Sequence, residues 1–426
     1  MANSRLCESL VRYAVRPMLC GYSELDLMAV SPRQFDVIVL GAGAAGLMCA
    51  AVAGQRGRRV VVLEHNGQPG RKILISGGGR CNFTNLNCEP GNFFSNNPHF
   101  AKSALALYQP RHFIELVERY GIPWHEKTLG QLFCDRSARA ILEMLLAECA
   151  LGGVEVVLNA GGIAASSSGG FSVESSRGEF RADALVVATG GLSIPKMGAT
   201  GLGYELARQF GLAVVEPRPA LVPLLLGGEE TGWTQLAGVA AEVVAQAGEA
   251  RSGEARFREK MLVTHRGLSG PAVLQASSYW RPGEALTVDF APHLAAGPGV
   301  FASLREPGAR RDQAALRQAL REMLPQRLAN RLAEVGGPPG WSNAALEARE
   351  RELRRWPFHP VGTEGFDKAE VTAGGVDTAG LQARTLEARA VPGLFFIGEV
   401  VDVTGWLGGF NFQWAWASGV AAGRAV

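Results

Sequence analysis

The sequence predicts an α/β fold in which a Rossmann-like nucleotide-binding domain is interrupted by an inserted domain. Two distant segments predict it. FDVIVLGAGAAGLMCAAVAGQRGRRVVVLE (residues 35–64) has the order strand, glycine-rich turn, helix and strand. GLFFIGEVVDVTGWLGGFNFQWAWASG (residues 393–419) starts another apolar strand near the end of the chain. We therefore expect residues 35–193 and 361–426 to form one discontinuous domain around an insertion at 194–360.

Several elements of the first domain follow from local pattern. Continuous apolar runs predict strands buried on both faces, and amphipathic spacing predicts helices. A small hairpin is expected where residues 171–175 and 179–182 flank Arg177-Gly178. The expected strands are 35–40, 60–63, 154–158 and 184–188, and the expected helices are 47–55, 111–120 and 139–151.

The insertion has a different pattern of polar and apolar residues. Short alternating segments at 222–226, 236–245, 256–263 and 285–290 predict an antiparallel, barrel-like β unit. A charged Leu/Ala-rich stretch at 310–335, broken by Pro325, and a second one at 344–355 predict helices. Residues 336–340 read as a linker, and residues 1–34 as a disordered tail or the product of an upstream start codon.

Composition narrows the class of protein. The 426 residues are 47% hydrophobic and 19% charged, as expected for a soluble globular chain of two or three domains. A net charge of +2 gives no electrostatic reason to expect a nucleic acid partner. The seven cysteines contain no CxxC spacing, so neither a disulfide scaffold nor a metal site is predicted, and a cytoplasmic location fits. No apolar run is long enough to span a membrane.

The motif GAGAAG (residues 41–46) predicts a dinucleotide site because a strand precedes it and a helix follows. Gly41 makes the tight turn, Gly43 lets the backbone approach a pyrophosphate, and Gly46 permits close packing of helix and strand. Glu64, at the end of the second strand, is placed to accept hydrogen bonds from ribose hydroxyls. This unit alone suits either NAD or FAD.

Three further segments favour FAD. The loop RKILISGGGRCNFTN (71–85) allows close backbone approach to a flat ligand, and a strand ends at ATGG (188–191). In the terminal segment, an acid after the strand-ending Gly398 is typical of a ribityl contact, and GGFN (408–411) begins a helix. The candidate cofactor-binding residues are Gly41, Gly43, Ala44, Ala45, Gly46, Glu64, Arg71, Lys72, Gly77, Gly78, Gly79, Arg80, Cys81, Asn82, Thr189, Gly190, Gly191, Gly398, Glu399, Asp402, Gly408, Gly409, Phe410 and Asn411.

Six blocks of sequence resemble a known family. They are GAGAAG (41–46), GRKILISGGGRCNFTN (70–85), ATGGLSIPKMGATGLGYELARQFG (188–211), THRGLSGPAVLQAS (264–277), FDKAEVTAGGV (366–376) and GEVVDVTGWLGGFNFQWAWASG (398–419). Over residues 35–426 the chain resembles the YhiN/BaiN-like family of bacterial NAD(P)/FAD-dependent oxidoreductases, within the glutathione-reductase-like FAD superfamily. The resemblance implies a discontinuous FAD-binding domain of glutathione-reductase type with an inserted β-plus-helical domain.

Two residues are candidates for catalysis. His265, within the insertion, can exchange a proton with a substrate, or it can be a hydrogen-bonded turn residue. Cys81, beside Arg80, can have a lowered pKa, or it can be a small side chain that fits beneath the cofactor.

Other groups have two interpretations each. Arg71 and Lys72 can bind flavin phosphate or a substrate acid, or they can be solvated. Trp406, Trp414 and Trp416 can line a substrate pocket or pack in the core. The basic helical stretch 310–331 can face nucleic acid, but its acids favour a solvated surface.

These features predict an FAD-dependent oxidoreductase that transfers a hydride between flavin N5 and a small organic substrate. NAD(P)H is the expected electron donor and visits transiently, because a second GxGxxG unit is not evident. The expected partner is a small molecule, with no nucleic acid and no membrane. The alternatives are an FAD-dependent oxidase that uses O₂ and an FAD-dependent tRNA-modifying or RNA-binding flavoprotein.

Overall fold

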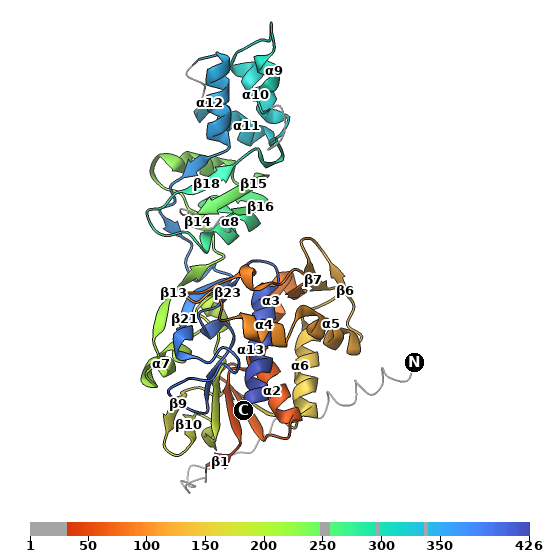
Figure 1. The fold of residues 1–426 in the computed structure, drawn as a ribbon, viewed down its shortest axis with the longest axis vertical. Helices are drawn as coiled ribbons and strands as arrows, with labels where there is room; N and C mark the ends of the chain where they lie inside the picture. The colour runs from red at the N-terminus through yellow and green to blue at the C-terminus, as the bar shows by residue number, and fades with distance from the viewer. Residues whose placement is uncertain (1–31, 248–255, 295–298, 336–339) are drawn as a thin grey trace. The chain divides into compact units, whose positions relative to one another are not determined.

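The computed structural model describes residues 32–247, 256–294, 299–335 and 340–426. The expectations for residues 1–31 and for the linker at 336–339 lie outside these ranges. The chain divides into two compact units (Figure 1): unit 1 is Met1–Pro217 with Gly374–Val426, and unit 2 is Arg218–Ala373.

Unit 1 is built on a five-stranded parallel sheet. Its strand order is β22 (Leu394–Phe396), β12 (Ala184–Val187), β2 (Val37–Leu40), β3 (Val60–Glu64) and β8 (Glu155–Leu158). Every residue of β2, β3, β12 and β22 is buried, as the continuous apolar runs predict. The Rossmann-like α/β fold is thereby confirmed.

Helices complete the core of unit 1. Helix α2 (Ala44–Gln55) packs against α13 (Phe410–Ala425) and α6 (Arg139–Leu151) (Figure 1). The contact of α2 with α13 is close because α13 carries glycines. A Cβ at Gly419 would lie 2.7 Å from Ala45 O, and one at Gly423 would lie 2.7 Å from Cys49 O.

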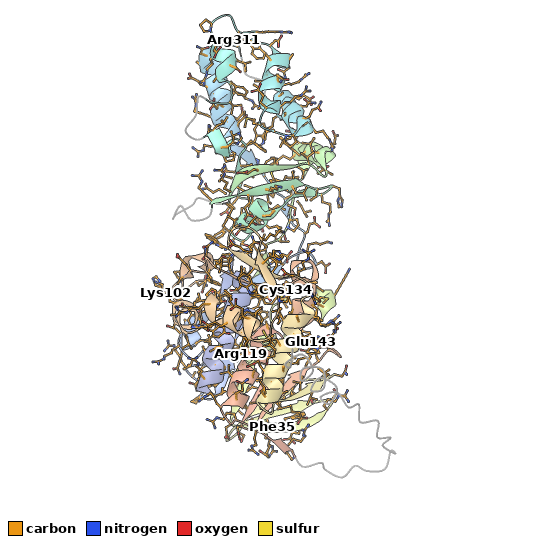
Figure 2. The ribbon with its side chains drawn as sticks, turned by 90° about the vertical axis from the view of Figure 1, so that its right-hand side faces the viewer. Phe35, Lys102, Arg119, Cys134, Glu143 and Arg311 are labelled. Carbon is orange, nitrogen blue, oxygen red and sulfur yellow. The ribbon has the colours of Figure 1, made fainter. Side chains whose placement is uncertain are left out.

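Smaller elements surround this core. The four-stranded sheet contains the expected hairpin, with Phe171 opposite Ala182. The remaining strands are β1 (Arg33–Gln34), β11 (Gly178–Ala182), β10 (Phe171–Ser175) and β9 (Ala164–Ser167) in one sheet, β4 (Asn82–Asn85), β7 (Gln131–Cys134) and β6 (Trp124–Glu126) in another, and the pair β23 (Thr404–Gly405) and β5 (Phe93–Phe94). The remaining helices are α3 (Arg71–Gly79), α4 (Lys102–Leu107), α5 (Pro110–Arg119) and α7 (Leu202–Gln209). Arg119 of α5 and Glu143 of α6 are exposed on this unit (Figure 2).

Unit 2 contains a seven-stranded antiparallel sheet with helix α8 (Pro271–Ser277) packed on β15 and β16. The strand order is β19 (Trp356–Phe358), β18 (Leu286–Asp289), β15 (Ala240–Ala247), β16 (Arg256–Val263), β17 (Gly267–Ser269), β14 (Leu224–Leu225) and β20 (Gly362–Thr363). The sheet has β19 and β20 at its ends, so the barrel-like closure expected from the sequence stays a prediction.

The described residues of unit 2 also form the α-helices α9 (Ala302–Arg305), α10 (Gln313–Arg321), α11 (Gln326–Val335) and α12 (Asn343–Leu353). The charged stretch divides into α10 and α11 just before Pro325 and after it, as the sequence predicts. Side chains cap two helix starts: Asp312 accepts a hydrogen bond from Ala315 N (2.9 Å) and Ser342 accepts one from Ala345 N (3.2 Å).

The boundaries of unit 2 lie later in the sequence than the expected 194 and 360. The chain passes between the units in β13 (Val214–Ala220) and β21 (Val371–Val376), which pair with each other. Helix α7 belongs to unit 1 because a Cβ at Gly203 would lie 2.3 Å from Thr189 Oγ1. Strand β20 extends unit 2 past residue 360 because it pairs with β14. Within the described residues, no helix is long and apolar enough to cross a membrane.

Candidate dinucleotide site

The candidate site lies at the carboxyl ends of the parallel strands in unit 1. Strand β2 has β3 on one side and β12 on the other, so the chain order reverses at β2. Ligands of open α/β sheets bind outside the carboxyl ends of the strands at such a point. The turn after β2 touches the end of β12, because a Cβ at Gly41 would lie 2.6 Å from Ala188 O.

The glycines of this edge fall into two kinds. A Cβ at Gly46 would lie 2.0 Å from Gly41 O, so Gly46 is required for the turn itself. A Cβ at Gly43, Gly78 or Gly190 would meet no atom within 4 Å, so these positions face open space. Helix α2 begins at Gly43 without a side-chain cap, which leaves its first N–H groups suited to an anion.

Glu64 is a buried acid with a defined orientation. Its Oε2 accepts a hydrogen bond from Ala42 N (2.9 Å), and its Oε1 accepts from Asn66 N (2.9 Å) and Asn66 Nδ2 (2.8 Å). Only 7% of the residue is exposed. Carboxylate oxygens have about four acceptor sites in all, so Glu64 retains capacity for a ribose hydroxyl.

Arg71 supports the orientation of Glu64 indirectly, through Asn66. Its Nη1 donates to Asn66 Oδ1 (2.6 Å), and the Asn66 amide in turn donates to Glu64. The sequence suggests a phosphate contact or a solvated side chain for Arg71, whereas the structure shows it oriented by Asn66. Asn66 has no motif around it, and its position at the end of β3 is the one signal that sequence offers.

A second polar cluster joins three distant segments. Lys72 Nζ donates to Ser193 Oγ (2.7 Å) and to Glu399 Oε2 (2.7 Å), and Ser193 Oγ donates to Glu399 Oε1 (2.9 Å). Ser193 is fully buried and sequence reasoning missed it, because no local pattern distinguishes a serine that meets partners from residues 72 and 399. Lys72 is thus paired rather than solvated.

Buried hydroxyls without partners lie near this cluster. Thr189 Oγ1 and Tyr204 OH are both buried and make no hydrogen bond within the described residues. Burial raises the pKa of Tyr204, and the nearby Glu399 raises it further, so its hydroxyl stays protonated. Orphaned buried polar atoms, open glycine positions, an uncapped helix start and an oriented acid together fit a bound dinucleotide.

The terminal segment makes mainly internal contacts. Asp402 is 4% exposed, and its Oδ2 accepts a hydrogen bond from Asn96 N (3.0 Å). A Cβ at Gly408 would lie 3.1 Å from Gln131, and one at Gly409 would lie 2.4 Å from Thr84 O. Asn411 Oδ1 accepts from Gly405 N (2.8 Å). Cofactor contacts by these residues, and by the adjacent buried Phe410, stay predictions.

The glycine-rich loop before Cys81 is the irregular end of helix α3. Helix α3 leaves helical geometry at Ser76, Gly77 and Gly78, and Gly77 is tightly packed, because a Cβ there would lie 2.8 Å from the Phe133 ring. Ala138 N donates to Gly79 O (2.7 Å) and Cys134 N to Arg80 O (2.9 Å), so the loop is anchored. Asn82 begins β4 directly after it.

Cys81 contradicts the hypothesis of an activated thiol. The residue is fully buried, and burial raises its pKa, whereas the hypothesis required Arg80 to lower it. The neighbouring Cys134 (Figure 2) is likewise buried, with its pKa raised to about 12. Cys81 therefore fills space beneath the loop.

The two tryptophans of α13 pack in the core. Trp414 Nε1 donates to Gly398 O (3.0 Å) and Trp416 Nε1 donates to Phe83 O (2.8 Å). Both are buried, and Trp416 stacks on Phe113 with ring centroids 4.3 Å apart. Neither lines a substrate pocket.

His265 belongs to unit 2, where it is exposed on the turn between β16 and β17. Thr264 Oγ1 orders this turn by accepting hydrogen bonds from Arg266 N (3.2 Å) and Gly267 N (3.1 Å).

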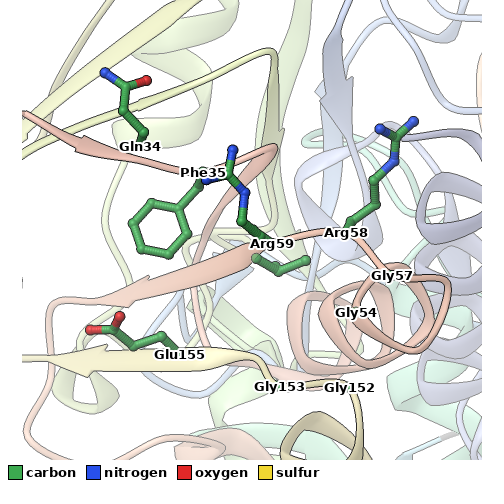
Figure 3. Close-up of a pocket in the computed structure, with 10 residues that line it drawn as sticks. Gln34, Phe35, Gly54, Gly57, Arg58, Arg59, Gly152, Gly153 and Glu155 are labelled. Carbon is green, nitrogen blue, oxygen red and sulfur yellow. The ribbon is translucent and has the colours of Figure 1, made fainter.

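A hollow of about 380 Å³ in unit 1 is a different feature (Figure 3). It lies at the amino ends of β3 and β8, opposite the carboxyl edge that carries Glu64, and is lined by Phe35, Arg59 and several glycines. Arg59 is already paired with Asp36 (2.9 Å).

Within the described residues, no cluster of His, Cys, Asp and Glu side chains could hold a metal ion.

The fold and this edge define a Rossmann-like dinucleotide-binding protein. Residues 35–425 match the family described as "HI0933-like protein Rossmann domain", and the chain belongs to that family. This confirms the resemblance found in the sequence.

Three relatives are named by their activity. The chain is 50% identical over 399 residues to "Ribosomal RNA dihydrouridine synthase" of Escherichia coli (strain K12), covering 92% of this chain and 98% of that protein. It is 42% identical to the protein of the same name from Haemophilus influenzae, covering 91% and 98%. It is 31% identical to "3-dehydro-bile acid delta(4,6)-reductase" of Clostridium scindens, covering 91% and 98%.

The relatives confirm one expectation and correct two. All three are enzymes, so the prediction of an enzyme of the flavin-dependent oxidoreductase class is confirmed. The expected small organic substrate and the expected absence of a nucleic acid partner are wrong, because the relatives at 50% and 42% identity are named for ribosomal RNA. The expected absence of a nucleic acid partner rested on the near-neutral net charge, which averages over the whole chain and does not report local concentrations of positive charge.

Proposed function

We propose that this protein is an FAD-dependent dihydrouridine synthase that acts on ribosomal RNA. The observation that carries the proposal is the 50% identity, over nearly the full length of both chains, to a protein named for that activity. The sequence named a tRNA-modifying or RNA-binding flavoprotein only as an alternative, and the proposal takes up this alternative with ribosomal RNA as the substrate. Such a substrate is cytoplasmic in bacteria, and we place the protein there.

The residues that would hold FAD are those of the candidate site. Gly43 and the uncapped start of α2 would accept the pyrophosphate, and Glu64 would accept hydrogen bonds from ribose hydroxyls. The open backbone at Gly190 is available to the same ligand. Lys72, Ser193 and Glu399 would fix the end of β22 relative to α3.

The proposed reaction saturates the C5–C6 double bond of a uracil base. It adds one hydride and one proton to the base, and NAD(P)H becomes NAD(P)⁺. Bound FAD would supply the hydride, with NAD(P)H as its transient donor. The protein must supply or relay the proton, and the His265 imidazole, exposed on its ordered turn, is our candidate donor.

The test uses ribosomal RNA that lacks the modification. Such RNA is isolated from an Escherichia coli strain deleted for its ribosomal RNA dihydrouridine synthase and incubated with the purified protein, FAD and NADPH or NADH. Digestion and mass spectrometry should reveal dihydrouridine, a uridine heavier by about 2 Da, dependent on reduced nicotinamide. Flavin that turns over without forming any dihydrouridine in ribosomal RNA would contradict the proposal.

His265 is tested in the same assay. His265→Gln should slow dihydrouridine formation by about tenfold or more while leaving flavin reduction by NADPH unchanged. The matched control is His359→Gln, another exposed histidine of unit 2, which contacts Glu230 (3.3 Å). Equal rates for the two variants would remove His265 from the proposal.

A further inference from the structure

We propose that unit 2 carries a binding surface for the phosphodiester backbone of RNA, formed by Arg317, Arg321, Arg327 and Arg331 on α10 and α11. We name these residues the arginine stripe. The inference rests on the proposed function, because RNA is its ligand, and it identifies where the chain holds that ligand.

Positive charge is concentrated in the helices of unit 2. Residues 301–355 contain 11 arginines and 7 acidic residues, whereas the whole chain has 42 basic and 40 acidic residues. The remainder of the chain is therefore slightly acidic, and its net charge hides a basic segment. RNA affinity depends on local phosphate neutralisation rather than on the net charge of the protein.

The stripe arginines keep their charge unneutralised. Four other arginines of these helices form ion pairs: Arg305 with Glu347, Arg310 with Asp312, Arg349 with Glu352, and Arg354 with Glu350. Within the described residues, no stripe arginine forms an ion pair. These four arginines have carboxylate partners, whereas the stripe arginines have none among the described residues.

The stripe is continuous across the two helices. Arg317 and Arg321 are one turn apart on α10, and Arg321 Nη2 donates to Asn330 Oδ1 (2.8 Å) of α11. Asn330 is about one turn from Arg327 on α11, so the arginine stripe continues from α10 to α11.

Neutral groups orient the far end of the stripe. Arg327 Nη1 donates to Ala237 O (3.4 Å), and the Arg331 guanidinium lies 5.7 Å from the centre of the Trp233 ring, which belongs to the 3₁₀ helix η3 (Gly228–Leu236). The Nε atoms of Arg317 and Arg331 are buried without an acceptor in the described residues. The contacts of Arg327 with Ala237 O and of Arg331 with the Trp233 ring order these two side chains without cancelling their charge.

The chemistry of the stripe favours phosphate over a protein partner. Arginine binds phosphate oxygens through paired N–H donors, and protein interfaces need buried apolar anchors. Among the described residues of α10 and α11, Val335 is the one large apolar side chain that is strongly exposed. The stripe therefore lacks the apolar centre of a protein interface.

The test compares two neutralising double variants in unit 2. Arg317→Gln/Arg321→Gln removes charge from the stripe, and the control Arg256→Gln/Arg258→Gln removes the same charge from exposed positions of β16. Filter binding to the unmodified Escherichia coli ribosomal RNA is measured over a series of KCl concentrations. We expect the stripe variant to bind about tenfold more weakly at 0.15 M salt, with a log–log salt slope lower by about 1.4, and the control to change less than about twofold.

A gain of affinity separates the stripe from a folding defect. Glu322 is exposed and follows Arg321 directly, within the screening length of about 8 Å. Glu322→Gln should tighten RNA binding by about two- to threefold, which a damaged fold does not do. Flavin content and the rate of flavin reduction by NADPH should be the same in every variant.

The outcomes distinguish the two proposals. If the unaltered protein neither binds nor modifies the RNA, the proposed function fails. If it does both and the stripe variant matches the β16 control, the arginine stripe is overturned while the function stands. Weakened binding to assembled ribosomal subunits, with unchanged binding to free RNA, would assign the stripe to a protein partner and overturn the proposal too.

Discussion

Glu64 shows how one buried side chain organises the candidate site. Its two oxygens hold Ala42 N in the glycine-rich turn and Asn66 beyond the strand, so one carboxylate connects the turn to the segment that follows β3. The acid itself was predictable from its distance to the GAGAAG motif. Asn66 and Arg71 were not assigned to its support, because their contacts depend on how the chain folds after β3.

Replacing Glu64 tests this role directly. In Glu64→Gln, one carboxylate oxygen becomes an NH₂ group, which cannot accept from Ala42 N or Asn66 N and binds ribose hydroxyls less strongly. Hydrogen bonds to a charged group contribute about 1.5–3 kcal/mol, so the Kd for FAD should rise by about 10- to 100-fold. Fluorescence titration of the cofactor-free protein measures it. Glu143→Gln, at an exposed position of α6 in the same unit, is the control and should retain FAD.

Cys81 gives a prediction in which catalysis does not change. Its buried thiol stays protonated at neutral pH, so Cys81→Ala should leave the rate of dihydrouridine formation within about twofold, with the same pH profile from pH 6 to 8. The unfolded thiol ionises near its ordinary pKa of 9.0 and the buried one does not. The stability owed to burial is therefore complete below pH 9 and declines above it. A tenfold loss of rate with intact flavin content would restore the catalytic hypothesis.

At the scale of elements, the turn between β2 and α2 separates two uses of glycine. Gly43 faces open space, with φ of −86° and ψ of −169° that alanine also adopts, whereas Gly46 contacts Gly41 O. The sequence motif predicts this division, with Gly43 facing a pyrophosphate and Gly46 serving close packing, and the surroundings of the two glycines agree with it.

This difference predicts opposite effects of the same substitution. Gly43→Ala should stabilise the cofactor-free protein by about 0.5 kcal/mol through the unfolded state, yet weaken FAD binding by tenfold or more, because a methyl group occupies the approach of the pyrophosphate. Gly46→Ala should destabilise the fold by about 3 kcal/mol or more, because its Cβ would lie 2.0 Å from Gly41 O. Thermal denaturation without FAD, followed by FAD titration, measures both. Similar melting temperatures for the two variants would refute the distinction.

The elements show which signals sequence carries. Buried parallel strands, the hairpin at 171–182 and the break at Pro325 were predictable, because each depends on neighbours in the chain. The Lys72–Ser193–Glu399 cluster was not, because it assembles from three segments of the fold. The same limit explains why α7 was assigned to the insertion: its amphipathic pattern does not reveal that Gly203 packs on Thr189.

At the scale of the whole molecule, the protein has two separately built cores. The continuous core of unit 1 runs from Val37 to Leu212 and resumes at Val376, and it includes none of the buried residues of unit 2. The substrate was the hardest property to infer from the sequence, because the recognisable motif and the basic helices belong to different units. The dinucleotide fingerprint lies in unit 1, whereas the basic helices lie in unit 2 and are diluted in the overall charge.

Two cores predict two responses to the cofactor. The proposed FAD contacts all belong to unit 1, so FAD should stabilise that unit and leave the intrinsic stability of unit 2 unchanged. At a free FAD concentration of 100 times Kd, the gain is about 2.7 kcal/mol, which raises the melting temperature by several degrees. Hydrogen exchange with and without FAD should therefore protect strands β2, β3 and β12, while β15 and β16 exchange at unchanged rates. The Glu64→Gln variant is the control, because it should lose this protection at the same FAD concentration. Equal protection of both sheets would show that the two units unfold as one and would contradict the prediction.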